Sequence, residues 1–239
     1  MLKKQKNRRV ILAADLLDVD AALAMIEPLA RELAFVKIGP GLFAQGGMLF
    51  VKKVMEIGFD VFLDLKLHDI PNTVAMAVRQ FADNGIWALT VHAAGGKAML
   101  ESAAKTRDAS GNPMKLFGVT VLTSHDLPSW EEVNPGCAME EALRSRARIC
   151  AASGIDGIVC SPSDLELLRP IAEGNLEMVV PGIRDQAGQD DQKRSAPLEQ
   201  ALEKGADYLV IGRPILKSPS PAIALSEIVD RVERWEQTR

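Results

Sequence analysis

The chain has 239 residues, 47% of them hydrophobic, and carries a formal net charge of −4 with a pI near 5.5. This length and apolar content suffice for one large hydrophobic core, and α/β barrels of this size are commonly single domains. Because 32 acidic residues outnumber 28 basic ones, a general nucleic-acid-binding or anionic-membrane-binding surface is not expected. A local cationic pocket remains compatible with this composition.

The N-terminal sequence and the cysteines bear on the compartment in which the protein is expected. A basic N-terminal stretch precedes an apolar run that stops at Asp15, which is too short for a signal peptide or a membrane-spanning helix. Cys137, Cys150 and Cys160 form no C-x-x-C pair and have no nearby histidine at zinc-ligand spacing. We therefore expect free thiols, a cytoplasmic protein and no membrane partner.

Short apolar, β-branched runs alternate with helical stretches along the whole chain. Periodic segments predict helices at 20–33, 74–84, 140–153 and 198–204, with helix starts near Asp18 and Pro71. The eight predicted strands are residues 10–14, 35–38, 61–65, 88–92, 116–122, 157–160, 177–180 and 208–211. This alternation predicts an α/β fold, a single (β/α)₈ TIM barrel that forms one domain over 1–239. An open doubly wound sheet is the alternative.

The third predicted strand carries charges where a buried strand should have none. Alternation of side chains places Phe62, Asp64, Lys66 and His68 on one face, while Asp69 has the opposite parity. A buried charge needs a partner, and an Asp-x-Lys pair in a strand is most often a structural ion pair. The longer string D-x-K-x-x-D-I-P-N-T is much more specific than such a pair.

Polar residues also follow the other predicted strands. In a (β/α)₈ barrel the reactive groups lie at the carboxyl ends of the strands, and phosphate is often bound after strands seven and eight. I-G-R-P at 211–214 fits such a phosphate site, because Gly212 allows close backbone approach and Arg213 can bind phosphate with two hydrogen bonds. The polar segment 184–195 has no periodicity and is expected to be either a functional loop or a disordered one.

The D-x-K-x-x-D-I-P-N-T string closely resembles the active-site motif of the orotidine 5'-monophosphate decarboxylase family. The resemblance extends over nearly the whole chain and favours the bacterial-type branch. Ala14 stands where the family usually has leucine before its aspartate, a mild departure that leaves the carboxylate of Asp15 in place. The other matching strings are A-A-D-L at 13–16, V-K-I-G at 36–39, V-H-A-A-G-G at 91–96, V-T-V-L-T-S at 119–124, P-G-I-R at 181–184, D-Q at 191–192 and I-G-R-P at 211–214.

The resemblance implies an enzyme that converts the nucleotide orotidine 5'-monophosphate to uridine 5'-monophosphate without cofactor or metal. It implies a homodimer with shared active sites, in which Asp69 and Thr73 enter the partner's site. The implied catalytic residues are Lys66, Asp64, Asp69 and Lys37. The implied substrate-binding residues are Asp15 for ribose, Thr123 or Ser124 for the pyrimidine, Arg184, Gln192, Arg213 and the Gly212 backbone for phosphate, and also Lys37, Ile70, Thr73 and Pro181.

Other interpretations of the same residues stay open. Metal-dependent sugar-phosphate decarboxylases share D-x-K-x-x-D, and related epimerases use a metal held partly by histidines, but this chain has only 3 histidines. Lys66 could be a Schiff-base lysine, although flanking carboxylates should keep it protonated. A phosphate-binding barrel without activity is a further alternative, which the intact Asp64, Lys66 and Asp69 set opposes. His92 and His68 can be structural residues.

Overall fold

The computed structural model describes residues 6–16, 18–172, 174, 176–185 and 194–238. Its parallel strands follow one another in the order β1 to β8 and close into a barrel, so the predicted (β/α)₈ fold is confirmed and the open sheet is excluded. Contacts group the chain into two compact units, Met1–Asp64 with Tyr208–Arg239 (the first unit) and Leu65–Asp207 (the second unit). The expectation of a single domain stays a prediction.

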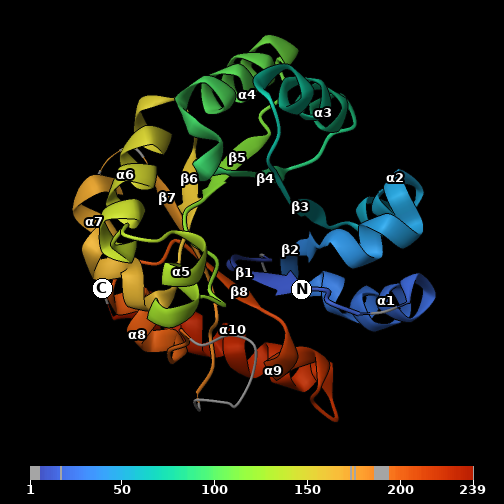
Figure 1. Cartoon of the computed structure of the whole chain (residues 1–239). Helices are drawn as coiled ribbons and strands as arrows, with labels where there is room; N and C mark the ends of the chain where they lie inside the picture. The colour runs from blue at the N-terminus through green and yellow to red at the C-terminus, as the bar shows by residue number, and fades with distance from the viewer. Residues whose placement is uncertain (1–5, 17, 173, 175, 186–193, 239) are drawn as a thin grey trace. The chain divides into compact units, whose positions relative to one another are not determined.

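The first unit contains the strands nearest the two ends of the chain, together with both termini (Figure 1). Leu12 of β1 pairs with Val36 of β2 and with Ile211 of β8, and Lys37 of β2 pairs with Phe62 of β3. The elements are β1 (Asn7–Ala13), α1 (Val19–Ile26), η1 (Glu27–Arg31), β2 (Leu33–Ile38), α2 (Pro40–Ile57), β3 (Asp60–Leu67), β8 (Tyr208–Ile211), α9 (Arg213–Leu216) and α10 (Pro221–Gln237). The boundary between the units falls within β3.

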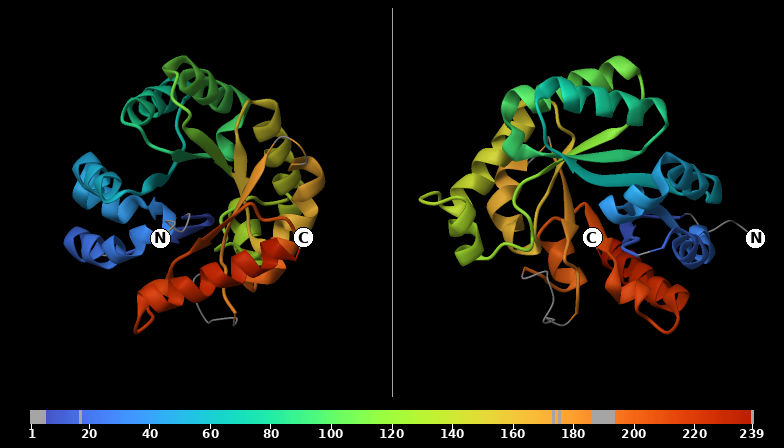
Figure 2. Two further views of the ribbon diagram at one scale, coloured as in Figure 1. Left: turned by 180° about the vertical axis from the view of Figure 1, so that it is seen from behind. Right: turned by 45° about the vertical axis from the view of Figure 1, so that its right-hand side comes forward.

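The second unit contains four neighbouring parallel strands with helices on their outer side (Figures 1 and 2). Helices α3 and α4 lie side by side in all views. The elements are α3 (Pro71–Asp83), β4 (Ala88–His92), η2 (Ala93–Gly95), α4 (Gly96–Ser110), β5 (Lys115–Val119), α5 (Leu127–Val133), α6 (Met139–Ala152), β6 (Gly157–Val159), η3 (Pro162–Asp164), α7 (Leu165–Ala172), β7 (Glu177–Pro181) and α8 (Leu198–Glu203).

Local sequence signals set several of these boundaries. Asp18 caps α1 by accepting a hydrogen bond from the Ala21 amide at 2.8 Å, and Pro71 is the first residue of α3, as predicted. Helix α2 ends at Ile57 and is capped by Gly58, whose φ of 104° is a conformation that glycine adopts at little cost. The strands are buried because helices cover them, and all six residues of β2 are buried.

Several sequence-based boundaries were wrong, and two of them have a clear local reason. The helix predicted at 20–33 stops at Ile26 and continues as a short 3₁₀ turn, because Pro28 has no amide hydrogen for another α-helical bond. The strand predicted at 116–122 ends at Val119. Beyond it the chain forms α5, which the hydrophobic pattern did not reveal but which Asp126 and Ser129 begin with a reciprocal capping box.

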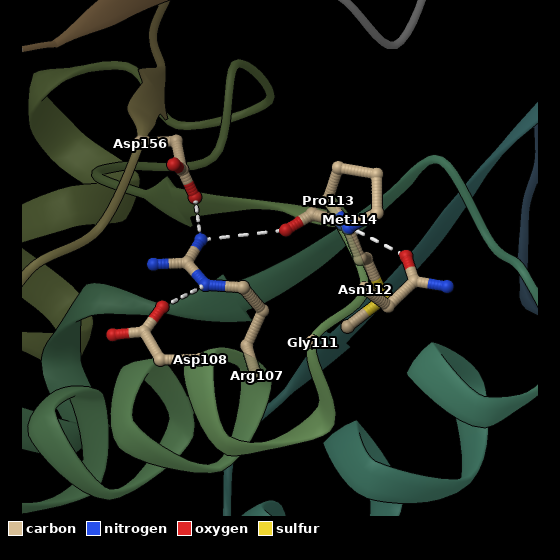
Figure 3. A pocket seen from close by; sticks show the side chains of 7 residues that line it. All are labelled: Arg107, Asp108, Gly111, Asn112, Pro113, Met114 and Asp156. Carbon is tan, nitrogen blue, oxygen red and sulfur yellow. Dashed lines mark hydrogen bonds and ion pairs between the residues drawn. The ribbon is translucent and has the colours of Figure 1, made fainter.

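A cavity of about 460 Å³ in the second unit lies beside Arg107 of α4 (Figure 3). The Arg107 guanidinium donates to the carboxylates of Asp108 and Asp156 and, at 3.3 Å, to the Met114 carbonyl. Asp156 also accepts the Leu116 amide at 2.8 Å. These residues precede β5 and β6, so the cavity lies at the amino ends of the strands, where polar residues of a barrel usually serve stability. Its paired charges are therefore a structural network.

Among the described residues, none of the helices combines the length and the apolar character that a membrane crossing needs.

Candidate active site

Three charged side chains of the first unit meet at the carboxyl ends of its strands. Lys37, the second-last residue of β2, has its Nζ 3.0 Å from Asp15 Oδ1 and 3.4 Å from Asp64 Oδ2. The side chains of Lys37 and Asp64 are only 10% and 14% exposed, whereas that of Asp15 is 63% exposed. One buried cation thus neutralises a half-buried carboxylate and leaves a second, accessible carboxylate able to meet a ligand.

The two carboxylates keep Lys37 charged. Burial works to lower the pKa of Lys37, but the attraction of Asp64 and then of Asp15 outweighs it and raises that pKa above its usual value. Because an unpaired buried charge is costly, the removal of either partner should disturb the other groups. Asp15 lies two residues beyond Ala13, the last residue of β1. A Cβ added at Gly39 would lie 3.3 Å from Asp15 Oδ1, so this glycine leaves room beside the carboxylate.

Lys66 has an unusual backbone. Its φ is 50°, which makes it the one non-glycine residue with positive φ in the described part of the chain. Such a left-handed conformation costs an L-residue about 1–2 kcal/mol. It also interrupts the alternation of side chains, so the predicted shared face of Phe62, Asp64, Lys66 and His68 does not continue through Lys66. His68 is exposed and lies outside β3. Strain of this kind is typical of functional positions.

Strand β4 provides contacts to the segment around Lys66. Thr90 is fully buried, and its Oγ1 accepts a hydrogen bond from the Lys66 amide at 2.8 Å. His92 ends β4, as predicted, and its ring stacks on that of His68 with 5.1 Å between ring centroids. Sequence analysis missed Thr90. The signal was its T-x-H spacing to His92, which places both side chains on one face of the strand.

His92 is uncharged near neutral pH. Burial, the neighbouring His68, and the positive charges of Arg146 and Lys66 lower the pKa of His92 to about 4. Its Nδ1 accepts a hydrogen bond from the Ala94 amide at 3.1 Å, which an uncharged ring can do. The structure therefore gives His92 a hydrogen-bonded role at the end of β4.

Thr123 and Ser124 were expected at the end of the fifth strand. They instead lie in a turn beyond β5, where Thr123 is half-buried and Ser124 is exposed. Arg146 of α6 donates to the Thr120 carbonyl at 2.6 Å, just before this turn. The strand is thus shorter than its apolar sequence suggests, and the chain beyond it forms the loop that leads into α5.

Of the four residues assigned to the phosphate, three are described, and so is the implied substrate-binding residue Pro181. Pro181 is the last residue of β7 and Arg184 follows it, half-buried, with its amide bonded to the Ala196 carbonyl at 2.9 Å. In the first unit, Gly212 and Arg213 follow β8, and Arg213 is the first residue of α9. Gln192 lies outside the described residues.

At the described end of the segment 184–195, the half-buried Arg194 forms an ion pair with the buried Asp164. Arg194 donates two hydrogen bonds to the Asp164 carboxylate, at 2.7 Å and 2.9 Å, and a third to the Leu122 carbonyl at 3.1 Å. The side chains of Arg194 and Asp164 are 13% and 7% exposed. This pair, which sequence analysis missed, joins the segments that follow β5, β6 and β7 and borders a second cavity of about 460 Å³.

Asp69, Ile70 and Thr73 lie at the start of α3. All three are exposed, and Asp69 Oδ1 accepts the Ile70 amide at 2.6 Å. Ile70 is 67% exposed and Met76, on the same helix, is 61% exposed. Asp69 lies beyond the end of β3, so it does not extend the row of charges on that strand.

The cysteines are free thiols, as predicted. Burial raises the pKa of the Cys150 thiol to about 12 and also raises the pKa of the Cys160 thiol. These two thiols are therefore unreactive core residues. Among the residues that the structure describes, no three histidine, cysteine or acidic side chains are grouped so as to hold a metal ion.

A closed parallel barrel that collects charged side chains at the carboxyl ends of its strands is characteristic of (β/α)₈-barrel enzymes. The family model described as Orotidine 5'-phosphate decarboxylase / HUMPS matches residues 8–228. The chain belongs to this family, which confirms the resemblance seen in its sequence motifs.

Relatives match nearly the full length of the chain. The orotidine 5'-phosphate decarboxylase of Dichelobacter nodosus is 41% identical over 221 residues, which cover 92% of this chain and 96% of that protein. The protein of the same name from Glaesserella parasuis is 42% identical over 226 residues, with coverages of 93% and 97%. The crystal structure of the Lactobacillus acidophilus orotidine 5'-phosphate decarboxylase has a TM-score of 0.81 and 35% identity, and the match covers 94% of this chain and 98% of that one.

Proposed function

We propose that this chain decarboxylates orotidine 5'-monophosphate to uridine 5'-monophosphate in pyrimidine biosynthesis, in the cytoplasm and without a cofactor. The observation that carries the proposal is the buried Lys37, which forms ion pairs with both Asp15 and Asp64. Asp64 in turn lies two residues before Lys66 in the sequence. Relatives that bear the name of this enzyme, at 41–42% identity over more than 90% of the chain, support the same reaction.

The chemistry requires stabilisation of negative charge. When the bond between C6 and the carboxyl carbon breaks, carbon dioxide leaves and an electron pair remains on C6 of the pyrimidine. In the proposed mechanism the Lys66 ammonium stabilises this pair and then transfers a proton to C6, after which the lysine amine regains a proton from water. Asp64, paired with Lys37, would lie near the departing carboxylate, where like charges disfavour the bound substrate.

The remaining residues bind the nucleotide in this proposal. Arg184, Gln192, Arg213 and the Gly212 backbone hold the phosphate, and binding energy from the phosphate helps to order the site around the pyrimidine. The exposed carboxylate of Asp15, beside Lys37, accepts hydrogen bonds from the ribose hydroxyls. Thr123 or Ser124 meets the pyrimidine. Further contacts to the substrate come from Ile70, Thr73 and Pro181.

The proposed enzyme is a homodimer that completes each site with residues from both subunits. Asp69 would enter the partner's site and complete a network of alternating charges with Lys37, Asp64 and Lys66. The exposure of Ile70 at 67% and Met76 at 61% supports a surface of α3 that a second subunit covers. Neither nucleic acid nor membrane is needed as a partner.

A metal-dependent decarboxylase or epimerase acting on a sugar phosphate is the second candidate, because the D-x-K-x-x-D motif alone does not distinguish such an enzyme from an orotidine 5'-monophosphate decarboxylase. An absorbance assay distinguishes the two. Purified protein treated with chelator should consume the absorbance of orotidine 5'-monophosphate and form uridine 5'-monophosphate. A protein that leaves this nucleotide intact and acts on a sugar phosphate would exclude our proposal.

We expect decarboxylation to survive EDTA. The proposed steps use only fixed charges and a lysine proton, and the carboxylates of Asp15 and Asp64 are already paired with Lys37. Initial rates should agree before and after dialysis against EDTA. A loss of rate that added magnesium restores would favour the metal-dependent candidate.

We expect Arg213→Ala to weaken phosphate-bearing ligands selectively. A charge-assisted contact between arginine and phosphate contributes about 2–4 kcal/mol when it is partly desolvated. Dissociation constants for uridine 5'-monophosphate and uridine, measured by calorimetry, should show a loss for the nucleotide alone. Lys217→Ala, which removes an exposed cation just after the same helix, is the control and should bind both ligands normally. Equal losses for nucleotide and nucleoside would place Arg213 away from the phosphate.

A further inference from the structure

The backbone of Lys66 is held in a conformation that a lysine does not choose by itself. Its φ is 50°, a value that glycine adopts readily because it has no Cβ. Lysine has a Cβ, so the residue type does not explain this conformation. A residue stays in such a conformation only when the surrounding structure requires it. The groups that touch the backbone on either side of Lys66 therefore determine where its side chain begins.

The hydroxyl of Thr90 is one of those groups. The Lys66 amide donates to Thr90 Oγ1 at 2.8 Å, whereas a strand amide ordinarily donates to a backbone carbonyl of the next strand. Thr90 is 0% exposed and lies in the middle of β4, where its backbone pairs with that of Phe117. Its branched side chain has little rotational freedom, so the oxygen occupies a fixed place.

A second contact from the same face of β4 restrains the chain after Lys66. The rings of His92 and His68 stack with 5.1 Å between centroids and 18° between planes. His92 is itself fixed by the hydrogen bond from the Ala94 amide. Thr90 and His92, two residues apart on one strand, thus hold the segment at Lys66 and at His68.

We propose that Thr90 is a positioning residue for Lys66: its hydroxyl fixes the left-handed backbone and so directs the lysine ammonium toward the reacting carbon. This inference rests on the proposed function, in which Lys66 delivers the proton. The lysine side chain is long, so a change of backbone conformation at its root moves the ammonium by far more than a charge-stabilising group tolerates. Thr90 itself does not touch the substrate in this account.

Three variants test the proposal. Thr90→Val keeps the shape and removes the hydroxyl, and Thr90→Ser keeps the hydroxyl. Thr120→Val is the matched control, because Thr120 is also 0% exposed and its hydroxyl donates to a backbone carbonyl, that of Val159, at 2.9 Å. For each variant we would measure kcat and KM for orotidine 5'-monophosphate, the Kd of uridine 5'-monophosphate, the melting temperature, and the exchange of the C6 hydrogen of uridine 5'-monophosphate in D₂O.

We expect Thr90→Val to lower kcat and the C6 exchange rate about 10- to 100-fold, the range associated with misplacement of a catalytic group by about 1 Å. The Kd of the product should change little, because the binding groups stay in place. Thr90→Ser should regain most of the rate, and Thr120→Val should keep native kcat even where its melting temperature falls as much. Native kcat in Thr90→Val, or equal loss in both valine variants, would overturn the inference.

Failure of the proposed function gives a different result. If the unaltered protein does not decarboxylate the nucleotide, that proposal fails, and a crystal structure of Thr90→Val then tests the inference alone. Lys66 should leave the left-handed region in that structure, and a retained φ near the present value would refute the role of Thr90. If Thr90→Val does not fold, Thr90→Ala, which deletes the same oxygen, takes its place in every measurement.

Discussion

Replacement of Lys66 by alanine should abolish nearly all decarboxylation and leave the barrel intact. The substitution deletes both the cation that stabilises the charge on C6 and the proton that neutralises it, and each contribution is worth orders of magnitude in rate. It should also relieve backbone strain little, because alanine still has a Cβ at a φ of 50°. Single-turnover rates with orotidine 5'-monophosphate give the size of the loss, and circular dichroism shows whether the fold persists.

The matched control for this prediction is Lys53→Ala, which removes an exposed lysine from α2 and should leave the rate unchanged. Ligand affinity in Lys66→Ala can change in either direction, because deletion of the cation leaves nearby carboxylates without part of their compensation. Near-normal decarboxylation by a folded Lys66→Ala protein would rule out Lys66 as the proton donor.

The second large effect is expected from mixing two inactive variants. If Asp69 works in the partner's site, Lys66→Ala and Asp69→Ala are each inactive, and a mixed dimer contains one site with both changes and one site with neither. Random exchange makes about half of the dimers mixed, so about a quarter of the native activity should return. The measurement is the decarboxylation rate after the two variants are mixed under conditions that allow subunit exchange.

Exchange must be demonstrated separately, for example by mass spectrometry of differently tagged subunits. Mixtures of each variant with itself serve as controls and should stay inactive. If mixed dimers form and no activity returns, Asp69 acts within its own chain, and the shared-site proposal is wrong. Restored activity would assign a function to the exposed start of α3, where Ile70 and Met76 leave apolar surface uncovered in the single chain.

Much of the fold could be predicted because its signals are local. Strands of a parallel barrel are covered on both faces, so their apolar runs stand out, as the fully buried β2 illustrates. Asp18 and Pro71 mark helix starts through capping and fixed φ, which need no knowledge of the rest of the chain. Predicted boundaries were wrong where local sequence did not determine them. At Val119, for example, β5 ends although the apolar sequence continues.

The candidate site likewise has features that could be predicted from the sequence and features that could not. The meeting of Lys37 with Asp64 could be expected from polar residues at adjacent strand ends. The left-handed backbone of Lys66 could not, because its amide is bonded to the hydroxyl of Thr90, which lies 24 residues away on another strand. The pair of Asp164 and Arg194, 30 residues apart, is likewise a tertiary contact with no spacing signature.

The most direct test of the account is to follow orotidine 5'-monophosphate in D₂O with purified, chelator-treated protein. Mass spectrometry and proton NMR would then identify the product. The account predicts release of one carbon dioxide per nucleotide and formation of uridine 5'-monophosphate that carries deuterium at C6, since the exchanged Lys66 ammonium supplies the deuteron. An unchanged substrate, or a product that appears only when magnesium is added, would contradict it.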